Sequence, residues 1–275
     1  MNGKDTGPFF EQVRMLAKDK LGIHLADHKN ALIENRLIRL KSKLGFGGSL
    51  DELISAVQKG DFEKEFISAF TTNQTAFFRE PAQFEHFKNE FLPSEFQNKN
   101  SLSVLSAGCS SGEEAYTIAM CFMASKQNGH SLKITALDID EEKLKTAKEG
   151  IYSIPHANPF PQFVSQNSYF QSYEDGGSKK LKMKDELKSI ISFEKHNLAN
   201  TKDTLKNSFF DAVFCRNTLI YFDKKKQEEI LKKLLGSLKL GGFLYLGHSE
   251  NPLSHIDRLQ KKGHNIYIKK AVEEI

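Results

Sequence analysis

The chain has 275 residues and a formal net charge of +4, with 39% hydrophobic and 27% charged residues, which is ordinary globular composition. It has no apolar run of about 18 residues, and its first residues lack the apolar core of a signal peptide. Cys109, Cys121 and Cys215 have neither a disulfide pattern nor metal-ligand spacing. We therefore expect a cytoplasmic protein with no metal site and no direct membrane insertion, built from one large domain and a smaller module.

Residues 1–70 are predicted to form a small N-terminal helical domain. Pro8 is suited to the start of a helix, a glycine-rich turn occupies 45–48, and the segment from Ser49 to Glu52 has the pattern of a capping box. Residues 29–43 have the spacing of an amphipathic helix. The apolar positions of this helix are predicted to be Ala31, Leu32, Leu37, Ile38 and Leu40.

The same helix has a basic flank, which consists of Arg36, Arg39, Lys41 and Lys43. One interpretation is a solvated helix face that contributes little to stability. The alternative is a docking surface for an acidic partner, whose carboxylates or phosphates these side chains would contact. The net charge alone does not indicate a nucleic acid partner.

Residues 71–100 are predicted to be a linker and a helix. The segment 71–80 (TTNQTAFFRE) is polar and aromatic and ends at Pro81. Phenylalanines at 84, 87 and 91 follow with helical spacing.

From residue 101 onward, short apolar runs alternate with helical segments. This alternation is typical of an α/β fold with a doubly wound parallel sheet and right-handed crossovers. The predicted strands are 102–107, 133–138, 190–194, 209–215, 242–247 and 265–269. The predicted helices are 113–126, 140–149 and 224–239.

About forty residues between Gly150 and Ile190 interrupt the alternation. They contain Pro155 and Pro159 shortly after Ile154, the turn Asp175-Gly-Gly177 and a basic run at 179–184. A plain crossover needs fewer residues, so we expect an inserted β-hairpin module at about 155–190. The apolar residues at 181 and 183 fit a short edge strand.

A nucleotide-type crevice is predicted where the first strand of the sheet ends. The strand is followed by the turn Gly108-Cys-Ser-Ser-Gly112 and by a helix that begins with Glu113 and Glu114. A helix N-terminus attracts phosphate, but these two acids would repel it. A ligand with cationic groups fits better. S-adenosyl-L-methionine (AdoMet) has an ammonium and a sulfonium, so the turn indicates methyl transfer.

The second strand ends in another cofactor signal, Asp138. An acid at this position can accept hydrogen bonds from both ribose hydroxyls of a nucleotide cofactor. The other possible role is to cap the next helix, and we assign that role to Asp140 and the ribose to Asp138.

Arg216, Asn217 and Tyr221 follow the apolar strand at 209–215 and should reach the same edge of the sheet. Tyr221 alone would be read as an amphipathic wall residue, and Arg216 as a surface ion-pair residue. Three polar groups after one apolar strand favour a functional role. His248, which follows another strand, is expected to be a loop histidine with structural hydrogen bonds.

Three segments together resemble the CheR-type chemoreceptor glutamate O-methyltransferases. They are 71–80, 107–114 (AGCSSGEE), and 214–223 (FCRNTLIYFD) with 247–251 (GHSEN). The N-terminal segment GIHLADHK at 22–29 also resembles that family, and the resemblance covers roughly 9–269. The chain departs from the usual family pattern at Gly108-Cys109 and at Ala115, where neither change removes a polar contact.

The resemblance implies a Rossmann-like class I AdoMet-dependent methyltransferase domain at 101–275, with the small helical domain before it and an inserted antiparallel β-subdomain. It implies transfer of a methyl group from AdoMet to glutamate side chains of methyl-accepting chemotaxis receptors, with S-adenosyl-L-homocysteine as the product. The implied partners are cytoplasmic receptor helices, and in some family members a receptor C-terminal tail binds the β-subdomain. We expect a monomer that binds no nucleic acid.

Matched by position, the resemblance implies that residues 71–100 contribute to the cofactor site. It places cofactor contacts at Asn73, Thr75, Arg79, Glu113, Asp138, Asn197, Leu198, Arg216 and Asn217. Arg79 and Tyr221 match residues near the transferred methyl group and are the expected catalytic residues. Glu113 is the expected ligand of the cofactor's ammonium.

Two other classes of protein would have the same fold. A nucleic-acid methyltransferase is disfavoured because no aromatic motif such as Asn-Pro-Pro-Tyr accompanies the cofactor strand. A catalytically silent AdoMet-binding module is disfavoured because the matched site residues are all present.

Overall fold

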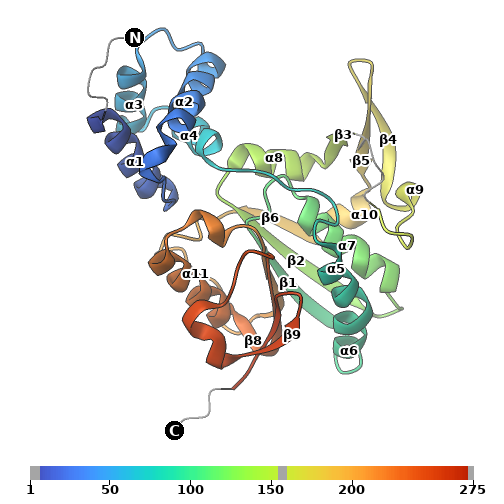
Figure 1. Cartoon of the computed structure of the whole chain (residues 1–275). Coiled ribbons are helices and arrows are strands. Elements are labelled where there is room, and N and C mark those ends of the chain that lie inside the picture. The colour runs from blue at the N-terminus through green and yellow to red at the C-terminus, as the bar shows by residue number, and fades with distance from the viewer. Residues whose placement is uncertain (1–6, 154–159, 272–275) are drawn as a thin grey trace.

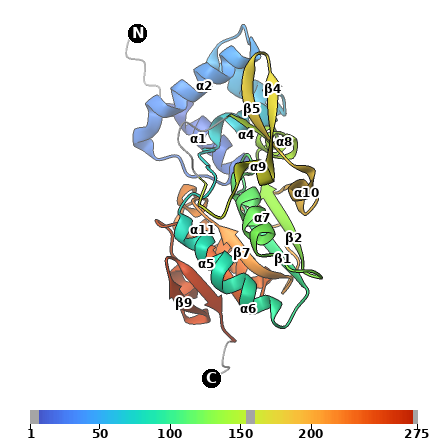
Figure 2. The same ribbon diagram turned by 90° about the vertical axis from the view of Figure 1, so that its right-hand side faces the viewer.

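The computed structural model describes residues 7–153 and 160–271. A group of N-terminal helices lies above a larger α/β domain, and a β-hairpin rises from the α/β domain to the level of these helices (Figure 1). The view turned by 90° shows the same stacking (Figure 2). Within the described residues, no helix is long and apolar enough to cross a membrane.

The N-terminal helices have a hydrophobic core of their own, which includes Val13, Ile33, Leu53 and Phe66. The predicted capping box is confirmed, because the Ser49 hydroxyl accepts from the Glu52 N–H and the Glu52 carboxylate accepts from the Ser49 N–H. The helices are α1 (Gly7–Leu21), the 3-10 helix η1 (Asp27–Lys29), α2 (Asn30–Leu44), α3 (Leu50–Lys59) and α4 (Glu63–Phe70).

The prediction for the buried face of α2 is partly wrong. Leu37 and Leu40 are buried as expected, but Leu32 is 40% exposed and Ile38 is 50% exposed. The other domain helices contact α2 on one side only, and the helical period places Leu32 and Ile38 away from that side. Apolar residues therefore lie on the outer surface of this helix.

A seven-stranded sheet forms the centre of the α/β domain, in the order β6-β2-β1-β7-β8-β10-β9. The five strands from β6 to β8 run parallel, as predicted. The bounds are β1 (Ser101–Ala107), β2 (Ser131–Asp138), β6 (Ile191–Lys195), β7 (Phe210–Cys215), β8 (Leu238–Leu246), β9 (Leu259–Gly263) and β10 (Ile266–Lys269).

The expectation of a wholly parallel sheet is wrong at its last two strands. The strand β10 pairs antiparallel with β8, and β9 pairs antiparallel with β10. Only two residues separate β9 from β10, and so short a connection permits only an antiparallel hairpin. The strand β9 was not predicted because its sequence, LQKKG, has a single apolar side chain.

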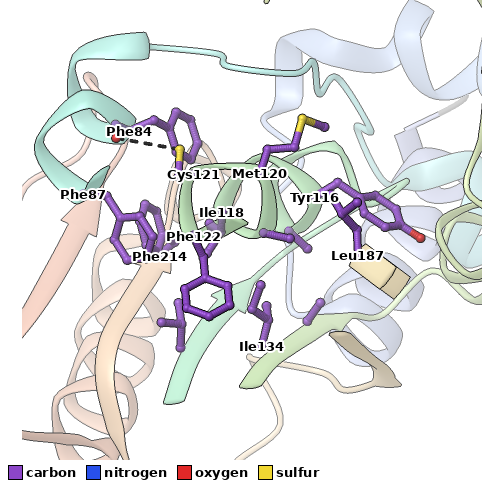
Figure 3. Close-up of a cluster of buried hydrophobic side chains, with 14 of the residues drawn as sticks. Phe84, Phe87, Tyr116, Ile118, Met120, Cys121, Phe122, Ile134, Leu187 and Phe214 are labelled. Carbon is purple, nitrogen blue, oxygen red and sulfur yellow. Dashed lines mark hydrogen bonds between the residues drawn. The ribbon is translucent and has the colours of Figure 1, made fainter. Parts of the chain in front are cut away.

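Helices pack on both sides of this sheet. Among them, α7 lies between the sheet and the helix predicted from the phenylalanine spacing, and Figure 3 shows Phe84 and Phe87 of that helix beside it. Phe84, Phe87 and Phe91 are all buried. The phenylalanine helix contains α5 (Pro81–His86), the π-helical turn η2 (Phe87–Phe91) and α6 (Leu92–Phe96). The others are α7 (Glu113–Ser125), α8 (Glu141–Glu149), α11 (Lys224–Ser237), and the 3-10 helices η3 (Leu219–Tyr221) and η4 (Leu253–Arg258).

The predicted inserted β module is present as a three-stranded antiparallel sheet in the order β3-β5-β4. Its predicted edge strand around 181 and 183 is wrong, because β5 pairs with a strand on each side and is therefore central. Residues 154–159, with the two prolines, lie outside the described residues. The module contains β3 (Ile151–Ser153), α9 (Gln166–Tyr169), β4 (Phe170–Asp175), β5 (Ser178–Met183) and α10 (Asp185–Lys188).

Candidate functional site

A cavity lies at the carboxyl ends of the parallel strands, where a doubly wound fold binds its ligands. It brings together residues from six segments that are far apart in the chain. The predicted site residues that line it are Asn73, Thr75, Arg79, Asp138, Asn197, Leu198, Arg216, Asn217 and Tyr221.

Asp138 is held in place by the glycine turn after β1. Its Oδ2 accepts from the Ser110 N–H at 2.7 Å, and its Oδ1 accepts from the Asp140 N–H at 2.9 Å. The side chain is buried, and burial raises the pKa of Asp138 against the opposing effect of these hydrogen bonds. Each carboxylate oxygen has a second lone pair, so Asp138 can also accept from a ligand in the cavity.

Asp140 caps α8 as predicted, because its Oδ1 accepts from the backbone N–H groups of Glu142 and Lys143. Its Oδ2 accepts from the Thr71 hydroxyl at 3.0 Å and from the Asn73 amide at 2.9 Å. The cap therefore also fixes the linker segment against the cavity. Asn73 lines the cavity but already donates to Asp140.

The two acids that open α7 have different surroundings. Glu114 lines the cavity and is paired with Arg216 at 3.1 Å, and it accepts from the Ser106 hydroxyl at 2.7 Å. Glu113 is not among the lining residues, and its Oε2 accepts from the Ser111 hydroxyl at 2.8 Å. Burial raises the pKa of both acids. Glu114 was not predicted as a site residue, although it is adjacent to Glu113 in the motif.

Arg216 lies between two half-buried carboxylates, and its own side chain is only 2% exposed. One guanidinium nitrogen pairs with Glu114 and the other with Glu80 at 3.2 Å, and the second also donates to the backbone carbonyl of Arg79. The guanidinium carbon lies 4.7 Å from the ring centre of Phe84. Arg216 thus connects the linker, α7 and the end of β7 below the cavity.

Glu80 is the second residue that the sequence analysis missed. Burial alone would raise the pKa of Glu80, but the hydrogen bond from Asn217 and the charge of Arg216 outweigh it and lower that pKa. The carboxylate is therefore ionised at neutral pH. Its partners Arg216 and Asn217 are 136 and 137 residues away, so the sequence around Glu80 does not reveal its role.

The two expected catalytic residues, Arg79 and Tyr221, are far apart in the sequence but line the same cavity. Arg79 donates to the backbone carbonyl of Gln74 at 2.7 Å, which bends its side chain back over its own segment. Tyr221 ends the 3-10 helix η3 and is half-buried at the cavity wall. His196 also lines the cavity, and its buried Nε2 has no hydrogen-bond partner within the described part of the chain.

The N-terminal domain contributes directly to this cavity, which was not predicted. Leu21 and Ile23, at the end of α1, are among the lining residues. The His24 N–H donates to the Tyr221 carbonyl at 3.2 Å. Gly22 has a φ of +75°, and a Cβ there would lie 2.2 Å from the Ala199 Cβ, so the two domains meet without space for a side chain.

Ion pairs join the two domains beside the cavity. Lys43 of α2 pairs with Glu142 at 2.6 Å, and Lys64 of α4 pairs with Glu141 at 2.7 Å. Both acids belong to the first turn of α8, where they also interact favourably with the helix dipole. Exposed pairs of this kind each contribute little. The domain contact also includes the packing around Gly22 and the packing of Ile139 against the N-terminal core.

The four basic residues predicted for docking thus divide into two groups. Arg36 donates to the Phe70 carbonyl and to the Thr72 hydroxyl, and Lys43 is paired with Glu142. Arg39 is exposed and Lys41 is half-buried, and neither has a partner among residues 7–153 and 160–271. Only Arg39 and Lys41 are therefore available to an external acidic group without loss of an internal contact.

The inserted module packs on the segment that carries Arg79. Phe77 makes edge-on ring contacts with Tyr152 at 5.0 Å and with Phe170 at 5.5 Å. The Phe78 N–H donates to the Thr117 hydroxyl of α7 at 3.2 Å. Both residues before Arg79 are thus anchored.

The residues present fit AdoMet. Asp138 is a buried acceptor suited to the ribose hydroxyls, and the acids at the start of α7 place negative charge where a cationic ligand is favoured over a phosphate. The apolar side chains of Leu21, Ile23 and Leu198 supply walls for uncharged parts of the ligand.

Two family profiles match the chain. The profile described as "CheR methyltransferase, all-alpha domain" matches residues 8–71, and the profile described as "CheR methyltransferase, SAM binding domain" matches residues 73–268.

Curated relatives agree with the profiles. The chemotaxis protein methyltransferase of Escherichia coli K12 is 36% identical over 264 residues, which are 94% of this chain and 89% of that protein. The protein of the same name from Borreliella burgdorferi is 36% identical over 243 residues, which are 84% of each chain. The one from Salmonella typhimurium LT2 is 35% identical over 267 residues, which are 94% of this chain and 88% of that protein.

Proposed function

Since this chain belongs to the CheR family of AdoMet-dependent methyltransferases, we propose that it methylates glutamate side chains on the cytoplasmic helices of chemotaxis receptors. The observation that carries the proposal is that Asn73, Arg79, Asp138, Asn217 and Tyr221, all expected site residues, line one cavity. The reaction gives glutamate methyl esters and S-adenosyl-L-homocysteine. We place it in the cytoplasm and expect the enzyme to act as a monomer.

AdoMet, when bound, supplies the electrophilic methyl group. A glutamate side chain has a reference pKa of about 4.3, so it is already a nucleophilic oxyanion at neutral pH. No general base is needed, and the residues of the chain have to align the carboxylate and replace its water. We assign this alignment to Arg79 and Tyr221. Their hydrogen bonds to the substrate carboxylate must not be too strong, because the negative charge of the carboxylate and the positive charge of the sulfonium both disappear during transfer. Tight binding of the ground state alone does not raise kcat.

We assign the cofactor's ribose to Asp138 and its ammonium to Glu113. Glu113 accepts a hydrogen bond from the neutral Ser111 hydroxyl and has no ion pair among the described residues, whereas the adjacent Glu114 pairs with Arg216 and accepts from the Ser106 hydroxyl. The carboxylate of Glu113 thus has the larger unused capacity to accept. Thr75, Asn197 and Leu198 complete the proposed cofactor contacts.

The proposed function is tested by the chemistry of the product. The purified protein is incubated with methyl-labelled AdoMet and membranes that carry the receptors of its own cell, and the label is then treated with base. A methyl ester releases the label as methanol, whereas an N-methylated base does not. Base-stable label, or no receptor label at all, would contradict the proposal.

Removing the hydroxyl of Tyr221 is expected to slow the methyl transfer itself. A hydrogen bond to a charged group contributes about 1.5 to 3 kcal/mol, so Tyr221→Phe should lower kcat by about 10- to 100-fold. The Kd of AdoMet should change little. Arg79→Ala should lower turnover as well. Initial rates at saturating AdoMet measure kcat, and calorimetric titration measures the Kd of AdoMet.

The control is Tyr116→Phe, because the Tyr116 hydroxyl donates to the Ala147 carbonyl in the core and does not line the cavity. It should lose some stability and keep its kcat. Equal kcat values for Tyr221→Phe and the wild type would remove Tyr221 from the catalytic role.

We propose that acidic receptor helices dock on α2 through Arg39 and Lys41. Raising the salt concentration should therefore slow receptor methylation more than it weakens AdoMet binding, because exposed charges are screened within about 10 Å. If each exposed ion pair contributes about 0.5 kcal/mol, neutralising both residues as glutamine should raise the receptor KM about fivefold.

A single exposed lysine on α11 gives the matched control. Lys232→Gln removes one positive charge without touching α2 and should leave the receptor KM unchanged. Equal salt sensitivity of methylation and of AdoMet binding would argue against docking by these charges.

The inserted module offers a second contact for a receptor. The strand β4 is at the edge of the small sheet, so one side of its backbone can pair with an extended peptide. We propose this edge as the place for a receptor C-terminal tail.

A further inference from the structure

One buried carboxylate near the cavity has no part in the proposed chemistry. Glu250 follows β8 in the GHSE turn and is only 5% exposed. Its Oε2 accepts from the N–H groups of Gly247 at 2.7 Å and Asn217 at 2.9 Å. Its Oε1 accepts from the N–H groups of Thr218 at 2.8 Å and Leu219 at 2.7 Å.

Three of these four donors belong to consecutive residues, 217 to 219, of the loop that leaves β7. Their N–H groups point in one direction and together form a positively polarised backbone site. The loop leads directly into the 3-10 helix η3, whose first N–H groups lack a side-chain cap at Thr218. The carboxylate of Glu250 satisfies these groups from a different strand.

The geometry of Asn217 shows why this loop needs an external support. Asn217 has a φ of +55°, a conformation that costs energy for a residue other than glycine. Ser110, on the other side of the cavity, has a φ of +49°, and its N–H is held by Asp138. Both strained residues thus donate to a buried carboxylate, but only Asp138 lines the cavity.

The turn 247–250, which carries Glu250, is itself held in place by Asn265. The side-chain amide of Asn265 donates to the backbone carbonyls of Gly247, His248 and Glu250. A Cβ on Gly247 would lie 2.7 Å from the Asn217 nitrogen, so the two loops are in direct contact. The position of Glu250 is therefore determined independently of any ligand.

We propose that Glu250 is a positioning residue for methyl transfer, which sets the orientation of Asn217 and Tyr221 by holding the backbone between them. This inference rests on the proposed role of Tyr221 in aligning the receptor glutamate. Glu250 does not line the cavity, so it acts through the loop rather than on the cofactor or the substrate.

The test variant is Glu250→Gln, which preserves the size of the side chain. A glutamine has one acceptor oxygen, and its amide nitrogen would face two backbone N–H donors. We expect kcat to fall at least about tenfold, while the Kd of AdoMet rises less than about threefold because Asp138 and the other contacts remain. Hydrogen exchange of the amides at 217–219 should accelerate, a readout that does not depend on activity.

The matched control is Asp211→Asn, near the start of β7, the strand from whose other end the 217–219 loop leaves. Asp211 is equally buried and accepts from the Ser103 N–H, from Lys99 and from Lys239. Its variant should lower the midpoint of thermal unfolding but leave kcat and the exchange at 217–219 unchanged. A second variant, Gly247→Ala, keeps Glu250 but pushes the two loops apart, and should show the same loss of kcat.

Two outcomes would overturn the proposal. One is a kcat for Glu250→Gln within about twofold of the wild type. The other is a loss of kcat with unchanged exchange at 217–219. A wild-type enzyme that forms no base-labile ester would instead overturn the proposed function, and the exchange measurement would still decide whether Glu250 holds the loop.

Discussion

Arg216→Met is expected to lower the free energy of unfolding by about 3 kcal/mol, the lower end of the range for a buried pair, because it leaves two half-buried carboxylates without their shared cation. Glu80 and Glu114 lie on either side of the guanidinium, and both have side chains only 12% exposed. The same change removes the donor to the Arg79 carbonyl. Urea unfolding followed by circular dichroism measures the loss.

The effect of the unpaired charges can be separated from the effect of losing the packing of Arg216 on Phe84. If unpaired charge is responsible, the triple variant Arg216→Met, Glu80→Gln, Glu114→Gln should recover part of the stability, since neutral amides cost less to bury than carboxylates. A loss below about 1 kcal/mol in the single variant, or no recovery in the triple variant, would show that the pairing is not what stabilises this region.

Replacing Asp138 by alanine should have the largest effect on cofactor binding. Two hydrogen bonds from ribose hydroxyls to a charged acceptor contribute about 1.5 kcal/mol each, so the Kd of AdoMet should rise about 100-fold. The variant also leaves the Ser110 N–H without its partner and loosens the glycine turn. Calorimetric titration with AdoMet measures the change.

Asp211→Asn serves as the reference for this experiment, because it alters a buried aspartate at the other end of the sheet. Its affinity for AdoMet should equal that of the wild type. Undiminished affinity in Asp138→Ala would mean that Asp138 supports the turn but does not bind the ribose.

The sequence predicts those parts of the fold and site that depend on local signals. Asp140 was assigned as a helix cap from the acids that follow it, and the structure confirms the cap. The parallel strands were predicted from their apolar runs, because a strand that is buried on both faces consists mostly of consecutive hydrophobic residues. Strand direction is not part of such a pattern, so the strand predicted at 265–269 is present as β10 but its antiparallel direction was not predicted.

The parts of the site that were missed depend on distant contacts. Glu80 acquires its role from Arg216 and Asn217, which are 136 and 137 residues away, although it lies in the 71–80 segment that carries the resemblance. Leu21 and Ile23 look like ordinary residues at the end of a helix and reach the cavity only through the docking of Gly22 on Ala199. A family resemblance carries over motif residues but not these supporting contacts.

Because Leu21 and Ile23 line the cavity, the functional site includes residues of both domains, although each domain has a separate hydrophobic core. The α1–α4 helices have their own hydrophobic core, distinct from the two cores of the α/β domain. Each domain thus has a hydrophobic core of its own, but the wall of the cavity is shared between them. A chain cut between the domains would divide a single site, even where both halves keep their fold.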